Sequence, residues 1–132
     1  MTYTTHFQHL LWGSIGIISS AALAYTIGVW GERLQRQLKR RHVVFFGIGF
    51  LCDITGTALM GVIAQRYDLH NTAHALTGTI AVMLMLIHLL WAIYTLAYGN
   101  DQSKRTFSRF SVFVWGIWML AFLSGMVLGM MR

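Results

Sequence analysis

Four long apolar runs, separated by short polar stretches, dominate the pattern of this chain. Stretches without Asp, Glu, Lys or Arg cover residues 1–31, 69–100 and 110–131, and Asp53 alone interrupts the apolar segment 43–65. A helix needs about 20 apolar residues to cross a hydrocarbon core of about 30 Å. The pattern therefore predicts one all-α domain over residues 1–132, an integral membrane four-helix bundle with spans at about 10–30, 43–65, 73–98 and 108–130.

Composition and charge support a membrane protein and predict its orientation. The chain is 56% hydrophobic and 11% charged, whereas roughly a quarter of the residues in soluble domains are charged. Because basic loops stay on the cytoplasmic side, the first and third connections should be cytoplasmic and both termini outside. This predicts a multi-pass membrane protein. The high pI then reflects topology rather than nucleic-acid binding, and anionic lipid is a second partner for the basic loops. Eight of the ten basic residues lie in these two connections: Arg33, Arg36, Lys39, Arg40, Arg41, Lys104, Arg105 and Arg109.

Three of the predicted spans carry stripes in which small residues alternate with polar ones at helical spacing. Such stripes let membrane helices pack closely, which is the purely structural interpretation. Histidine beside glycine on several facing stripes would also leave a slot for a flat, bulky group. The stripes are His9, Gly13, Gly16 and Ser20; His42, Phe46, Gly49, Asp53, Gly56 and Met60; and His74, Gly78, Ala81, Met85, His88 and Ala92.

The histidines of these stripes are candidate haem ligands. His9 and His74 both lie at outer span entrances, and two imidazoles facing each other across a bundle can supply both axial positions of a haem iron. Gly13 and Gly78 would give the porphyrin room. His88 follows His74 by fourteen positions, which leaves about a 40° rotation and a separation of roughly 21 Å on one helix. The spacing thus predicts a second, inner site at His88.

Asp53 is the second candidate at the inner site. An acidic side chain near mid-membrane is a functional-site hypothesis by default. Counted from the cytoplasmic ends, Asp53 and His88 should lie at one depth, where the carboxylate would hydrogen-bond the imidazole. The alternative is a protonated Asp53, or one bonded to Thr or Ser of a neighbouring helix. His42 falls short of His88 by roughly 10–15 Å of rise. Tilt or a shifted helix boundary could close some of this gap; otherwise the inner haem is five-coordinate, or His42 binds at the interface. Arg40 and Arg41 would neutralise propionates.

Three segments carry a family resemblance. "YTIGVWGERLQRQLKRRHVVFFGIGFLCDITGTALMG", "HALTGTIAVMLMLIHLLWA" and "FSVFVWGIWMLAFLSGM", within residues 25–126, resemble the HsmA family of small bacterial membrane proteins. The resemblance implies a four-helix protein that binds haem at the membrane and protects the cell from haem and oxidative stress. His42, His74, His88 and Asp53 lie within these segments and His9 does not. If His9 is not a ligand of the outer haem, the thioether of Met60 is the nearest side chain in the outer half that could replace it.

Together these observations predict a protein that binds haem b, one haem or two, for sequestration or for redox defence. One form of that defence is electron transfer between a membrane quinone and a small oxidant. Two axial histidines would favour electron transfer, whereas a single His88 would favour oxygen or peroxide chemistry and a haem-dependent oxidoreductase. The alternative is a haem-independent transporter or proton-relay subunit that uses Asp53 and His88. The pattern leaves association between copies of the chain open.

Overall fold

The computed structural model describes residues 2–68 and 72–130, and within them the side chains of residues 5–68 and 73–127. This part of the chain forms four helices and no strand: α1 (Thr2–Gln35), α2 (Arg40–Arg66), α3 (Thr72–Tyr98) and α4 (Asp101–Met130). Each is long and apolar enough to cross a membrane. The predicted all-α chain with four helices long and apolar enough to span a membrane is confirmed.

The helices run past the apolar segments that predicted them. α1 begins at Thr2 and continues to Gln35, where Arg36 adopts a left-handed backbone conformation with φ of 55°. α4 begins at Asp101, directly after Asn100, whose side-chain oxygen accepts the backbone N–H of Ser103 over 2.8 Å. The chain contains no proline, so nothing breaks a helix where its sequence turns polar. The helices therefore continue through the polar residues at both ends of each apolar segment.

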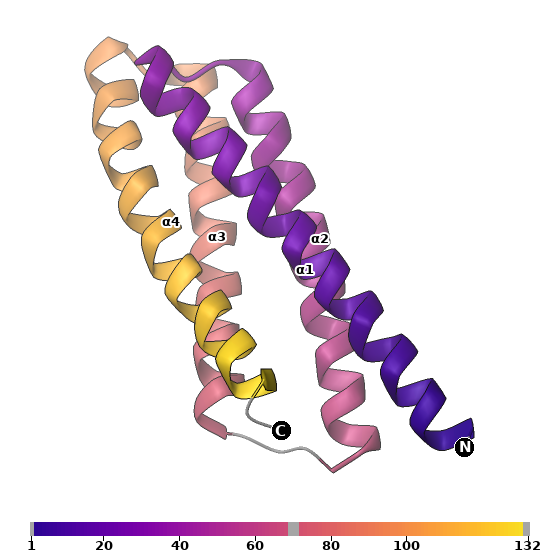
Figure 1. The fold of residues 1–132 in the computed structure, drawn as a ribbon. Coiled ribbons are helices and arrows are strands. Elements are labelled where there is room, and N and C mark those ends of the chain that lie inside the picture. Colours follow the sequence, from indigo (N-terminus) through magenta and orange to yellow (C-terminus); the bar gives the residue numbers. More distant parts are fainter. Residues whose placement is uncertain (1, 69–71, 131–132) are drawn as a thin grey trace.

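The four helices form a ring in chain order. Each helix packs against the next one, and α1 also contacts α4, so that α1 and α3, like α2 and α4, occupy opposite corners. Figure 1 shows the four helices drawn together at the end that carries the α1–α2 and α3–α4 turns. Towards the start of α1 and the end of α4, the α1–α2 pair diverges from the α3–α4 pair. The tightly packed end is thus the one with the two basic connections.

Two apolar clusters fill the bundle, and apolar side chains also cover its outside. Outward-facing side chains include Trp12, Leu34 and Leu120, which are 68%, 79% and 70% exposed. An apolar surface of this extent suits a lipid environment. The first cluster contains Ala21, Tyr25, Ala81, Met85, Val114 and Trp118, and the second contains Val29, Leu38, Phe46, Ala92 and Phe107.

The predicted stripes of α2 and α3 face the core over most of their length. All five members of the α2 stripe from His42 to Gly56 are buried, and Met60 is half-buried. On α3 the stripe is buried from Ala81 to Ala92, whereas His74 is exposed and Gly78 is half-buried. The spacing argument is therefore confirmed for the part of both helices nearest the basic turns.

The predicted face of α1 is wrong. His9, Gly13, Gly16 and Ser20 are all exposed. Because α1 is apolar on every side, the spacing of its apolar residues does not reveal which face is buried. Small residues lie on its outer face as well. The buried face of α1 instead follows Ser14, Ala21, Ala24, Tyr25, Gly28, Val29 and Glu32.

Candidate functional site

Two polar layers cross the interior of the bundle, and seven residues separate them on each of three helices. We name them the Asp53 layer (Tyr25, Asp53 and Trp118) and the His88 layer (Glu32, Phe46, His88 and Ser111). The pairs Tyr25/Glu32 on α1, Asp53/Phe46 on α2 and Trp118/Ser111 on α4 each span two helical turns. Seven residues return a helix to nearly the same face about 10 Å further along. The layers are therefore stacked along the bundle axis.

In the Asp53 layer, one carboxylate collects donors from three helices. Tyr25 of α1 donates its hydroxyl to Oδ2 over 3.1 Å, and Trp118 of α4 donates its indole N–H to the same oxygen over 2.9 Å. Thr57, one turn along α2, donates to Oδ1 over 3.5 Å. The rings of Tyr25 and Trp118 also meet edge to face at 5.0 Å. Asp53 is 2% exposed, and this set of donors satisfies both of its oxygens.

The His88 layer is built around an imidazole that is completely buried. Its Nε2 shares a hydrogen bond of 2.7 Å with the hydroxyl of Ser111, whereas its Nδ1 has no partner. Phe107 stacks on the ring at 5.1 Å between centroids, and Phe46 meets it edge-on at 4.6 Å. His88 is thus held by one polar contact and two aromatic ones.

The predicted hydrogen bond between Asp53 and His88 is not formed. Asp53 is paired with Tyr25, Trp118 and Thr57, and His88 with Ser111, two turns further along the bundle. α2 begins at Arg40, three residues before the predicted start, which moves Asp53 nearly one turn away from the basic end. The buried carboxylate in the His88 layer is instead that of Glu32.

Glu32 is the functional candidate that the sequence reasoning missed. It is completely buried, and neither carboxylate oxygen has a hydrogen-bond partner in the described part of the chain. The signal was available: Glu32 lies seven positions after Tyr25, and Ser111 seven positions before Trp118. Heptad spacing from two polar-tipped aromatic residues places both on the buried faces of their helices.

His42 takes a structural role at the start of α2. Its Nδ1 accepts the backbone N–H of Lys39 over 3.0 Å, which satisfies one of the donors that every helix start leaves open. A neutral imidazole that accepts at Nδ1 carries its proton on Nε2. That Nε2 is buried without a partner, on the ring edge 3.5 Å from where a side chain at Gly31 would begin. In this arrangement, Nε2 of His42 is a hydrogen-bond donor without an acceptor and offers no free lone pair to a metal.

The outer candidates are not brought together in the interior. His9 is exposed on α1, and His74 is exposed on α3 with its ring against Gly125 of α4. Gly78 and Gly13 have no atom within 4 Å of the position where a side chain would begin. Arg40 and Arg41 are exposed at the start of α2, beside His42. Of the predicted ligands, only His88 and His42 are buried.

Of the glycines on the predicted stripes, Gly49 and Gly56 are filled by the protein's own side chains, and so is Gly28, which the stripes did not include. A side chain at Gly28 would start 2.7 Å from the ring of Phe46, and one at Gly49 would start 2.6 Å from the ring of Tyr25. Gly56 is occupied in the same way by Ile18. Close approach of helices at glycine is what small residues allow in membrane bundles. These three glycines therefore serve packing in this arrangement.

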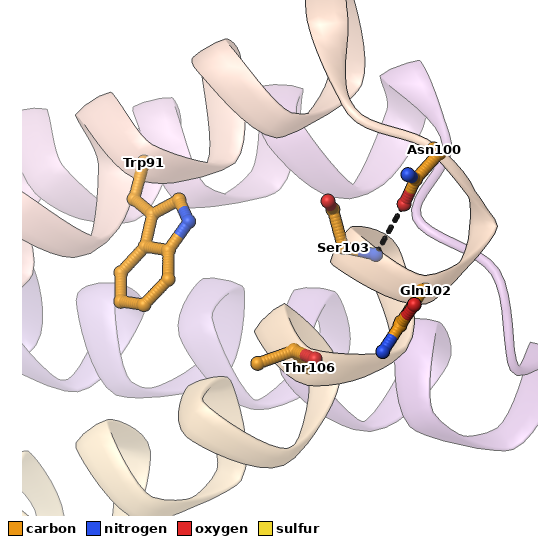
Figure 2. A pocket seen from close by; sticks show the side chains of 5 residues that line it. All are labelled: Trp91, Asn100, Gln102, Ser103 and Thr106. Atoms are coloured by element: carbon orange, nitrogen blue, oxygen red, sulfur yellow. Dashed lines mark hydrogen bonds between the residues drawn. The ribbon is translucent and has the colours of Figure 1, made fainter.

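Shallow hollows lie at the α3–α4 turn. Figure 2 shows one of them, lined by Trp91, Asn100, Gln102, Ser103 and Thr106, with the Asn100–Ser103 hydrogen bond at its edge. A neighbouring hollow shares Gln102 and Thr106 and adds Arg105 and Arg109. Both are polar and open at the surface, and they belong to the basic end of the bundle rather than to the His88 layer.

A metal site made only of side chains is not present in residues 2–68 and 72–130, where no three His, Cys, Asp or Glu side chains lie close enough to hold an ion. Haem iron needs fewer protein ligands than a bare metal ion, since the porphyrin supplies four nitrogens and the protein supplies one or two axial ligands. The partnerless nitrogen of His88, with the other nitrogen held by Ser111, fits one axial ligand.

Comparison with known proteins gives no relative: no family model, curated protein or solved structure matches the chain. Any functional conclusion therefore rests on the residues themselves.

Proposed function

We propose that this chain is a membrane protein that binds haem b through His88. The observation that carries the proposal is the state of that imidazole: completely buried, fixed at Nε2 by Ser111, and partnerless at Nδ1. Metal-bound histidines generally have their second nitrogen held by a neighbouring group. Membership of the HsmA family, which the resemblance of segments within residues 25–126 implies, is part of the same proposal.

The donor set favours a single axial histidine. His42 would have to give up the Lys39 N–H at Nδ1 before Nε2 could present a lone pair. His9 and His74 are exposed. Haem held by one histidine supplies an iron with an open position, which suits haem sequestration or reaction with a small oxidant better than simple electron transfer. We therefore rank a quinone-linked electron-transfer role below these two.

The residues around His88 would bind and orient the group. Phe46 and Phe107 exclude water from the imidazole and limit its rotation. Ser111 anchors Nε2, so that Nδ1 keeps its direction. Phe46 lies 4.6 Å from the imidazole between ring centroids, so a porphyrin at His88 would either pack against that ring or displace it. Arg40 and Arg41, exposed at the start of α2 at this end of the bundle, would neutralise the propionates.

The orientation belongs to the same proposal. The α1–α2 and α3–α4 turns, which carry most of the basic residues, face the cytoplasm, and both termini lie on the outer side. The protein then resides in a bacterial inner membrane. Arg105 and Arg109 line an open hollow at this end, which fits the phosphate of an anionic lipid headgroup.

The test is haem binding by the purified, detergent-solubilised chain. Wild-type protein expressed with adequate haem should show a Soret band and a defined haem-to-protein ratio in a pyridine haemochrome assay. His88→Gln keeps a polar side chain near Ser111 but has no imidazole, and should lose that haem. His74→Ala is the matched control and should retain it. A wild-type protein without a Soret band would defeat the proposal.

The second candidate is a haem-independent transporter or proton-relay subunit. Two observations favour it: the core glycines are filled by side chains, and two buried carboxylates, Glu32 and Asp53, lie on stacked layers. Buried acids in membrane spans commonly mark proton paths. A haem-free protein whose Asp53→Asn and Glu32→Gln variants abolish proton-coupled transport in vesicles would favour this candidate.

A further inference from the structure

Three buried side chains near the basic end of the bundle hold polar atoms that have no hydrogen-bond partner in the described part of the chain. These atoms are both carboxylate oxygens of Glu32, Nε2 of His42 and Nδ1 of His88. Glu32 is 0% exposed and His42 is 3% exposed, so bulk water does not reach these atoms. Buried polar groups of this kind are commonly satisfied by an ordered water in the interior.

The contacts between α1 and α2 fix the register of these two helices, which run antiparallel on either side of a short turn (Figure 1). A side chain at Gly49 would begin 2.6 Å from the Tyr25 ring, and one at Gly28 would begin 2.7 Å from the Phe46 ring. A step of three residues forward on α1 thus matches a step of three residues back on α2. One further turn, four residues on each helix, leads from these two contacts to a third facing pair.

Glu32 and His42 are this third pair. Glu32 follows Gly28 by four residues and His42 precedes Phe46 by four residues, so both lie on the helix faces that already touch. The next residue along α1 gives the same level, because a side chain at Gly31 would begin 3.5 Å from Cδ2 and Nε2 of His42. Glu32 therefore leaves α1 at the level of the His42 ring. No hydrogen bond joins the two side chains directly.

The two side chains are complementary as hydrogen-bonding groups. Nδ1 of His42 accepts the backbone N–H of Lys39, so Nε2 of the neutral ring carries the hydrogen and can only donate. The carboxyl group of Glu32 has acceptor lone pairs in either protonation state. Arg33 and Arg36, the cations that follow Glu32 along the chain, are exposed at the surface. A buried donor and a buried acceptor thus face each other across the α1–α2 interface.

We propose that a water molecule binds between Glu32 and His42 and joins the two side chains. The water accepts the Nε2 hydrogen of His42 and donates one of its own hydrogens to the carboxyl group of Glu32. Gly31 leaves room for it, because a residue without a side chain stands beside Nε2. A chain of hydrogen bonds then runs from the backbone of Lys39 through the imidazole and the water to α1, and it satisfies the buried donor and the buried acceptor together.

The water site has a consequence for the choice of imidazole that binds iron. With Lys39 at Nδ1 and the water at Nε2, both nitrogens of His42 are engaged. His88 is then the buried imidazole that keeps a nitrogen without a partner. The water site itself does not depend on haem, and its tests use the haem-free chain. A missing Soret band and a missing water are therefore separate outcomes.

The first test is NMR of the full chain in detergent with ¹⁵N labelling, in which the Nε2–H of His42 is assigned through its ring couplings. In the wild type this hydrogen should show a cross-relaxation peak with water. The backbone N–H of Phe46, which lies inside α2, is the control and should show none. Glu32→Leu should remove the water peak of His42 and shift its Nε2 signal. A wild type without the peak, or a Glu32→Leu spectrum that keeps it, would overturn the proposal.

The second test is a double-mutant cycle on unfolding in detergent. Wild type, Glu32→Leu, His42→Phe and the double variant form the cycle, in which the lost bond to Lys39 cancels. Because each single change leaves the other side chain unsatisfied, the two should be coupled by about 3- to 30-fold in the unfolding equilibrium constant. Glu32→Leu combined with Thr57→Val, a change in a donor to Asp53, should be additive. Additive effects of the Glu32 and His42 changes would contradict the bridge. The water peak of the wild type decides the matter even where a variant does not fold.

Discussion

Trp118 donates its indole N–H to the carboxylate of Asp53 over 2.9 Å and so joins α4 to α2, which occupy opposite corners of the bundle. The hydroxyl of Tyr25 meets the same oxygen from α1. One carboxylate thus connects helices that share no direct backbone contact. Asp53 is placed to hold the bundle together, a role that needs no ligand.

Asp53→Ala should destabilise the bundle strongly, because the Tyr25 and Trp118 donors would stay buried without an acceptor. Each such group costs about 1–3 kcal/mol. Thermal unfolding in detergent should show a much lower midpoint than for Thr55→Ala, an exposed position on the same helix. Equal midpoints for the two variants would contradict the role assigned to the Asp53 layer.

Gly49→Ala and Gly47→Ala should change stability in opposite directions. Alanine is favoured over glycine in a helix by up to about 1 kcal/mol, and at Gly47 no atom lies within 4 Å to oppose it. At Gly49 the new methyl group would meet the Tyr25 ring at 2.6 Å, and such overpacking costs about 1–3 kcal/mol. Denaturation in detergent should rank Gly47→Ala above wild type and Gly49→Ala below it. The reverse order would mean that Tyr25 does not occupy the Gly49 slot.

Phe46→Leu should tighten haem binding if the porphyrin displaces that ring from His88. Moving the aromatic ring away from the imidazole forfeits about 0.5–1.5 kcal/mol, and leucine removes this cost, which corresponds to about a 2- to 10-fold lower Kd. Haem titration followed at the Soret band measures the change. Phe110→Leu is the control, since Phe110 contacts Trp91 rather than His88. Weaker binding by Phe46→Leu would argue that Phe46 is part of the haem pocket as it stands.

Alkaline phosphatase fused after Arg132 should be active in cells, because the proposed orientation puts the C-terminus outside. The same enzyme fused after Asn100, in the α3–α4 turn, should be inactive in the cytoplasm. A fluorescent protein at each position should give the opposite pattern. Active phosphatase at Asn100 would reverse the proposed topology.

The number of helices and two of their inward faces could be predicted from the sequence, because apolar length and helical period are local properties. The stripe through Phe46 and Asp53 follows directly from spacing. The face of α1 could not, since an evenly apolar helix has little periodic contrast. Its inward side is marked by a few polar-tipped residues such as Tyr25 and Glu32.

Which polar groups meet could be predicted less well, because that depends on the register between helices. Asp53 and His88 were expected at one depth from counts that assumed a later start for α2. The actual start at Arg40 moves Asp53 towards Trp118 and leaves His88 with Ser111. An error of three residues, about 4.5 Å of rise, is enough to exchange one partner for another.

The length of α1 has a consequence for the membrane around it. Its 34 residues span about 51 Å at 1.5 Å per residue, against a hydrocarbon thickness of about 30 Å. The surplus is absorbed by tilt or by overhang into the headgroups on both sides. Bilayer thickness then sets how far His6 and His9 stand in water. In a thicker bilayer, the diverging ends of the two helix pairs would be drawn deeper into lipid.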